Sequence, residues 1–158
     1  MNGMTLTRRQ FLARAGGLAA AAPLAGWAAA SDGAALVRPA QLAARLKRGD
    51  RPAIFQVGFD VLFRAAHIPG AEYAGPASRP EGLAMLRQAL QKLPRDRAVV
   101  LYCGCCPWVK CPNIHPAAAE VRRLGMRDVE LLYLRTSFAQ DWVRAGFPTA
   151  GRDIQQKA

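Results

Sequence analysis

All four cysteines of the 158-residue chain lie within nine residues of one another, in the stretch YCGCCPWVKCPN. They are Cys103, Cys105, Cys106 and Cys111. Thiols this close together cannot form disulfide cross-links between distant parts of the fold. Three kinds of chemistry are open to such a cluster: it can bind a metal ion, form disulfides, or carry sulfur.

A metal site is the first alternative, because thiolates are soft ligands that suit Cu(I), Zn or an iron–sulfur centre. The four cysteines and His115 are the candidate ligands. Their spacing is shorter than that of the two separated knuckles in most structural zinc sites, so four ligands on one ion would need a contorted loop. No other cofactor is expected.

Thiol redox chemistry is the second alternative. A disulfide between the adjacent Cys105 and Cys106 would be strained, whereas Cys106 and Cys111 flank four residues and could close a small loop. Cys105 could instead resolve a persulfide or a sulfenate on Cys103. We expect Cys106 and Cys111 to interact, by a disulfide or by a shared metal, and to order residues 107–110 over Cys103.

The elements around the cluster alternate between strands and helices. Apolar, β-rich runs predict buried strands over residues 53–58, 98–102 and 129–134. Helical spacing and end signals predict helices over 39–49, from a cap at Ser78 to Leu93, from Pro116 to Gly125, and around Trp142. This alternation predicts an α/β fold with a mostly parallel central sheet and helices on both faces.

Cys103 directly follows the predicted strand 98–102. In open α/β sheets ligands bind beyond the carboxyl ends of the strands. Backbone N–H groups and the dipole of the next helix are expected to favour a thiolate there, and a thiolate attacks electrophilic sulfur or phosphorus. Cys103 is therefore the predicted nucleophile. Lys110, the only cation of the loop, and His115, next to the expected helix start, could assist it.

Three segments resemble parts of a single rhodanese domain: HIPGA at 67–71, VVLYC at 99–103 and the closing segment 142–148. The resemblance covers residues 35–148. It implies a rhodanese-like fold and a sulfurtransferase in which Cys103 accepts a sulfane sulfur as a persulfide and passes it to a thiol or another acceptor. The partners it implies are a small sulfur-containing anion or a thiol acceptor, and a periplasmic redox or sulfur-relay protein.

The chain departs from the rhodanese pattern around the loop. The path from Cys103 to the expected helix start is much longer than in rhodaneses, and it contains no arginine. Gln56 and Phe59 stand where an aspartate and an arginine are usual. A related cysteine phosphatase would need a closing arginine to bind phosphate with two hydrogen bonds, so phosphatase activity is not expected. Two rivals to sulfur transfer remain, a metal-binding protein and a thiol–disulfide oxidoreductase on the same fold.

The N-terminal segment is expected to be an export signal. TRRQFL, with Arg8 and Arg9, is a twin-arginine pattern, and an apolar, alanine-rich run follows over 18–30. The run is shorter than the roughly 20 residues that cross a bilayer, so no stable membrane span is expected after cleavage. Residues 1–30 would be the signal, and 31–158 one rhodanese-like domain in the periplasm, where thiols tend to be oxidised.

The net charge of the chain is +11, and it falls to +8 without the three arginines of the predicted signal. A basic protein can bind nucleic acid, an anionic membrane surface or a small anionic substrate. Here the lysines and arginines are dispersed through predicted helices, with no dense run and no interleaved aromatic residues. Nucleic acid is therefore not an expected partner.

Overall fold

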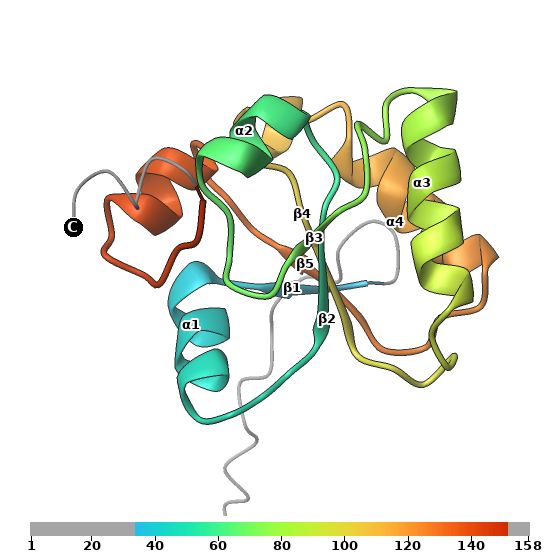
Figure 1. Cartoon of the computed structure of the whole chain (residues 1–158), viewed down its shortest axis with the longest axis horizontal. Helices are drawn as coiled ribbons and strands as arrows, with labels where there is room; N and C mark the ends of the chain where they lie inside the picture. The colour runs from blue at the N-terminus through green and yellow to red at the C-terminus, as the bar shows by residue number, and fades with distance from the viewer. Residues whose placement is uncertain (1–33, 152–158) are drawn as a thin grey trace, which may run out of the picture.

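The structure, a computed structural model, describes residues 34–151 (Figure 1). The predicted signal peptide lies outside these residues. Five strands form one sheet in the order β1-β5-β4-β2-β3, and every pairing is parallel. The strands are β1 (Ala35–Val37), β2 (Ala53–Gln56), β3 (Glu72–Tyr73), β4 (Val99–Tyr102) and β5 (Val129–Leu132). The predicted α/β class and parallel sheet are confirmed.

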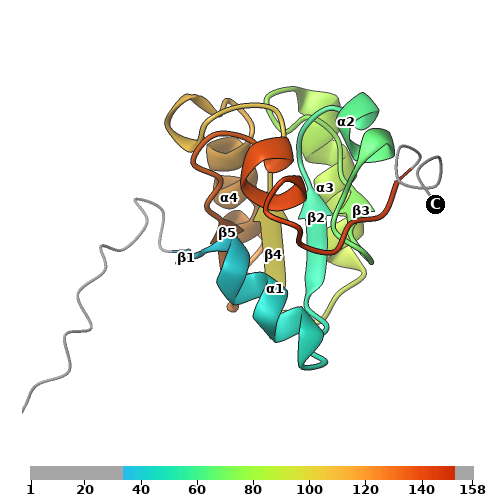
Figure 2. The ribbon, with the colours of Figure 1, turned by 90° about the vertical axis from the view of Figure 1, so that its left-hand side faces the viewer.

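Helices cover both faces of the sheet (Figure 2). They are α1 (Pro39–Lys47), α2 (Asp60–Ala65), α3 (Pro80–Gln91) and α4 (Ile114–Arg123), with two short turns, η1 (Trp108–Lys110) and η2 (Ala139–Val143). α1 and η2 lie on one face, and α3 and α4 on the other. Among residues 34–151, no helix is long and apolar enough to cross a membrane.

The alternation of side chains along β4 decides which face each residue serves. Val100 and Tyr102 pack with the α1 side, whereas Val99 and Leu101 pack with α3 and α4. Cys103 continues this alternation and belongs to the α3–α4 side. The central position of β4 explains why the whole strand is buried.

Two predicted helix starts are wrong. α3 begins at Pro80 after Arg79, and no side chain caps it, so Ser78 is not the cap. α4 begins at Ile114, which places Pro116 within its first turn. Proline is tolerated there because the first N–H groups of a helix have no partner within the helix. Gly125 does follow the end of α4, with φ of 75°, as predicted.

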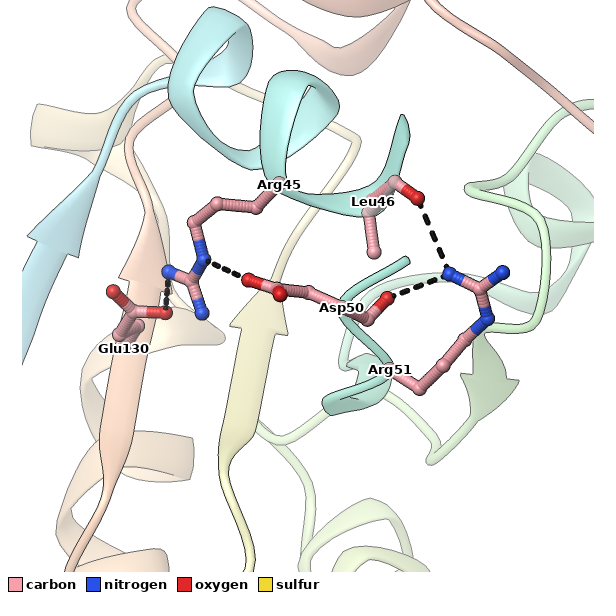
Figure 3. Close-up of polar contacts among 5 residues, drawn as sticks. All are labelled: Arg45, Leu46, Asp50, Arg51 and Glu130. Atoms are coloured by element: carbon pink, nitrogen blue, oxygen red, sulfur yellow. Dashed lines mark hydrogen bonds and ion pairs between the residues drawn. The ribbon is translucent and has the colours of Figure 1, made fainter. Parts of the chain in front are cut away.

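Ion pairs hold α1 against β5 and the turn that follows α1 (Figure 3). They lie near the amino ends of the strands, and the cysteine loop lies at the carboxyl ends. The Arg45 guanidinium donates to Glu130 of β5 at 2.5 Å and to Asp50 at 3.0 Å. Arg51 donates to the carbonyl oxygens of Leu46 and Asp50, at 3.2 and 2.9 Å. These contacts hold the turn after α1 against the sheet and do not reach the cysteines.

The segment after β5 packs against the α1 face through Trp142, which is fully buried. Its ring stacks on Phe138 with 5.9 Å between centroids, and its Nε1–H donates to the carbonyl oxygen of Pro148 at 2.8 Å. The Asp141 carboxylate accepts from two backbone N–H groups of the preceding turn, at 2.6 and 3.1 Å. Asp141 therefore makes a capping contact at this turn, and Trp142 packs in the core.

The HIPGA segment has a structural role in the fold. The His67 ring stacks on Phe63 at 4.0 Å between centroids, and its Nδ1 lies 2.7 Å from the Phe63 carbonyl oxygen. The backbone of His67 pairs with Ala150, and Ile68 N–H donates to the hydroxyl of Tyr102 at 3.3 Å. The segment thus joins the C-terminal end of the described chain to the central strand.

Candidate active site and cysteine cluster

The loop over residues 103–113 leaves the carboxyl end of β4 and is anchored to the segment after β5. Trp108 N–H donates to the carbonyl oxygen of Leu134 at 3.0 Å. The carbonyl oxygen of Gly104 accepts from Phe138 N–H at 3.3 Å. These backbone contacts, together with the turn η1, give the loop a defined path despite its length.

The loop brings all four predicted cysteines together as free thiols. The Cys103 and Cys105 sulfurs are 3.2 Å apart, and the Cys105 and Cys106 sulfurs 3.1 Å apart. The sulfurs of Cys103, Cys106 and Cys111 all lie within 4.8 Å of one another. Cys103 and Cys111 are buried, and the other two are half-buried.

The thiols differ in how readily they ionise. A hydrogen bond from the Cys103 thiol, with backbone N–H groups of Asn113 and Ile114, lowers the pKa of Cys111 to about 6. The same contact with Cys111, together with burial, raises the pKa of Cys103. Burial and contact with Cys105 raise the pKa of Cys106 to about 12. We expected the backbone N–H groups at the start of the next helix to favour a thiolate at Cys103. Those of Asn113 and Ile114 instead donate to Cys111, which lies three residues before α4 begins.

Asn113 is a site residue that the sequence did not single out. It is fully buried, and its Oδ1 accepts from the backbone N–H of Ser78 at 2.9 Å. That contact turns its Nδ2 toward the sulfurs of Cys103, at 3.4 Å, and Cys105, at 3.9 Å. The only local signal was a polar residue just before a helix, which suggests a cap, yet Asn113 makes no side-chain capping bond.

Replacing Asn113 with alanine should loosen the loop. The variant leaves the Ser78 N–H without its acceptor, so we expect a loss of about 1–3 kcal/mol in unfolding free energy, and faster alkylation of Cys103. Urea unfolding and mass-resolved alkylation kinetics measure the two effects. Pro112→Ala, next to it on the exposed side of the loop, is the control. Equal behaviour of the two variants would show that Asn113 does not hold the loop.

A small cavity of about 10 Å³ lies beside Cys103. It is lined by Cys103, Cys106, Trp108, Cys111, Ile114, Leu132 and Leu134. Its volume is close to that of one water-sized sphere, and its lining residues include no carboxylate and no cationic side chain. The half-buried Trp108 forms part of its wall. The cavity is therefore large enough for one atom, and that atom would contact sulfur and apolar groups.

Lys110 and His115 do not line the cavity. Lys110 ends η1 and is exposed, and His115 is exposed with its ring edge-on to Trp108 at 5.6 Å between centroids. His115 is also not among the three residues whose ligand atoms lie within 4.8 Å of one another. The structure thus places both residues at the protein surface, away from the cavity that Cys103, Cys106 and Cys111 line.

The strand beside β4 contributes a close backbone approach to Cys103. A Cβ atom added at Gly58 would lie 3.1 Å from the Cys103 sulfur, so glycine leaves room for this thiol. Gln56, which stands where an aspartate is usual in rhodaneses, is buried and accepts from Gly58 N–H at 3.3 Å. The Cys103 sulfur thus lies against uncharged groups on this side as well.

The sequence matches no protein-family model and no curated protein. Solved structures do match. The rhodanese-like domain of the Alr3790 protein from Anabaena sp. is 21% identical, with a TM-score of 0.59 over 77% of this chain and 82% of that one. The chain has a rhodanese-like fold. The BH2092 protein from Bacillus halodurans is 19% identical, with a TM-score of 0.59 over 76% and 79% of the two chains.

One match to this rhodanese-like domain has a named activity. A thiosulfate sulfurtransferase from Pseudomonas aeruginosa is 27% identical, with a TM-score of 0.53 over 76% of this chain. The similarity covers only 20% of that enzyme. The fold therefore occurs in a sulfurtransferase, as the resemblance of the sequence implied.

Proposed function

We propose that this rhodanese-like protein transfers sulfane sulfur through a persulfide on Cys103. The observation that carries the proposal is the place of Cys103, at the carboxyl end of the central strand β4 and beside a cavity of about 10 Å³. Similarity to part of a thiosulfate sulfurtransferase supports the same reaction class. The cavity offers room for one added sulfur atom.

The reaction needs no group beyond the thiols and the two substrates. The Cys103 sulfur attacks the outer sulfur of a donor R–S–S⁻, its proton passing to a neighbouring thiolate such as Cys111. The donor S–S bond breaks and R–S⁻ leaves with the electron pair. An acceptor thiolate then attacks the outer sulfur of the Cys103 persulfide, and the Cys103 thiolate is the leaving group. No net oxidation occurs.

The surroundings of Cys103 favour a persulfide donor over thiosulfate. None of the residues within 34–151 that line the cavity is cationic, and Lys110 and His115 are not among them. A dianion such as thiosulfate would lose hydration there without gaining a charged partner. A small thiol persulfide, or the persulfide of a partner protein, brings less charge to the site. The acceptor would be a thiol of the same kind.

The proposal includes export. The twin-arginine pattern with Arg8 and Arg9 would place the folded domain in the periplasm. A redox or sulfur-relay protein of that compartment would then be the partner. A half-buried thiol next to Cys103, such as Cys105 at 3.2 Å, could pass sulfur onward to it.

Intact-mass measurement tests the sulfur transfer. The reduced domain, incubated without oxygen with glutathione persulfide, should gain the mass of one sulfur atom. Fragmentation should locate that sulfur on Cys103, and an added thiol should remove it. Thiosulfate should load the protein more slowly. Absence of any gain with both donors, or a gain located only on another cysteine, would refute the proposal.

A further inference from the structure

We propose that the thiolates of Cys103, Cys106 and Cys111 form a binding site for a single Cu(I) ion. The inference goes beyond sulfur transfer and does not depend on it. The three sulfurs lie within 4.8 Å of one another and face the same cavity. Each comes from a different part of the loop: the end of β4, the middle of the loop and the approach to α4.

The geometry fits three sulfurs around one ion. With metal–sulfur bonds of about 2.3 Å, sulfurs in a trigonal plane are roughly 4 Å apart. The separations in the structure have an upper limit of 4.8 Å, so side-chain shifts of under an ångström would close the site. The cavity between them, about 10 Å³, admits one monatomic ion.

The donor set indicates a soft metal. In the part of the chain that the structure describes, the other residues lining the cavity are Trp108, Ile114, Leu132 and Leu134, which present no carboxylate and no imidazole. All-sulfur sites select soft ions such as Cu(I) or Zn. Structural zinc closes its shell with four ligands, and the fourth thiol, Cys105, is not among the cavity-lining residues. Cu(I) can be bound by three thiolate ligands alone. It is therefore the ion that we assign to this site.

Three thiolates and one monovalent cation together carry a net negative charge. Neighbouring N–H groups are placed to stabilise that charge. The Asn113 amide donates to the Cys103 sulfur at 3.4 Å, held there by its bond to Ser78. Backbone N–H groups at the start of α4 donate to Cys111. Hydrogen bonds to ligand sulfurs of this kind fix the ligands and tune a metal site.

Copper binding and sulfur transfer would exclude each other, since the Cys103 sulfur cannot hold both groups at the same time. Cu(I) loading should therefore block formation of the persulfide. The two proposals can nevertheless fail separately. Copper binding is measured without any sulfur donor, and the persulfide is measured without copper.

The test is a titration of the reduced domain with tetrakis(acetonitrile)copper(I) under anaerobic conditions. Bathocuproine disulfonate serves as the competing chelator, and native mass spectrometry counts the ions. We expect one copper per chain. Serine at Cys103, Cys106 or Cys111 should each weaken binding by at least about 100-fold, because each change removes a direct ligand. Cys105→Ser is the matched control and should stay within about tenfold of the wild type.

Four results would overturn the assignment. The first is that the protein does not take Cu(I) from the chelator. The second is that each chain binds two or more copper ions. The third is a loss for Cys105→Ser as large as for the other three variants, which would indicate a four-thiolate site. The last is a stable 1:1 complex with Zn(II) that excludes Cu(I). Circular dichroism of each serine variant checks that weaker binding does not come from unfolding.

Discussion

Cys103→Ser is expected to lower the rate of sulfur transfer at least about a thousand-fold, since loss of a nucleophile removes the covalent route altogether. A serine hydroxyl near neutral pH is a far poorer nucleophile than a thiol that can ionise. It also cannot carry sulfane sulfur. Turnover of a persulfide donor to a thiol acceptor, with intact mass of the protein, measures the loss.

The control for this prediction is Cys105→Ser. The Cys105 sulfur lies 3.2 Å from that of Cys103, so this change alters a direct contact of Cys103 and keeps the Cys103 thiol itself. We expect this variant still to load one sulfur on Cys103. Both variants should melt near the wild-type temperature, because serine is nearly isosteric with cysteine. Activity that persists without Cys103 and disappears with serine at Cys105 or Cys106 would show that the nucleophile is misassigned.

Trp142→Ala should destabilise the domain by about 3–5 kcal/mol, the range for removing a large buried aromatic side chain. The indole is fully buried, stacks on Phe138 and contacts Phe147 at 5.2 Å between centroids. Phe138 in turn donates its N–H to Gly104 of the cysteine loop. Urea unfolding followed by circular dichroism gives the change, and faster alkylation of Cys103 should accompany it.

Trp142→Phe separates packing from hydrogen bonding in the same place. It keeps an aromatic ring between Phe138 and Phe147 but removes the Nε1–H that donates to Pro148. We expect it to lose only about 1–2 kcal/mol. If Trp142→Ala were as stable as Trp142→Phe, the packing of Trp142 against Phe138 and Phe147 would contribute little to stability. These aromatic side chains would then not support the cysteine loop.

The sequence by itself determined the class of fold and the position of Cys103 at the end of the central strand. Apolar β-rich runs marked β2, β4 and β5, since a strand buried on both faces reads as continuous hydrophobic sequence. Cys103 directly after β4 followed from the same run. The structure then places Cys103 on the same face of the sheet as Leu101, as the period of two along a strand requires.

The sequence analysis did not predict the strands and the helix that lack a long apolar or periodic run. β1 and β3 have three and two residues, too few to show a period, and α2 has six. These segments are ordered by partners far along the chain. β3, for example, is a strand because residues 72 and 73 pair with β2.

Only the tertiary structure decided which groups contact each thiol. Local sequence could not show that Asn113 would reach Ser78, 35 residues away, or that this bond would turn the amide toward Cys103. It also could not show that the start of α4 would direct its N–H groups at Cys111. Hydrogen bonds between distant segments leave no period in the sequence, and the ionisation of a thiol depends on those bonds and on burial.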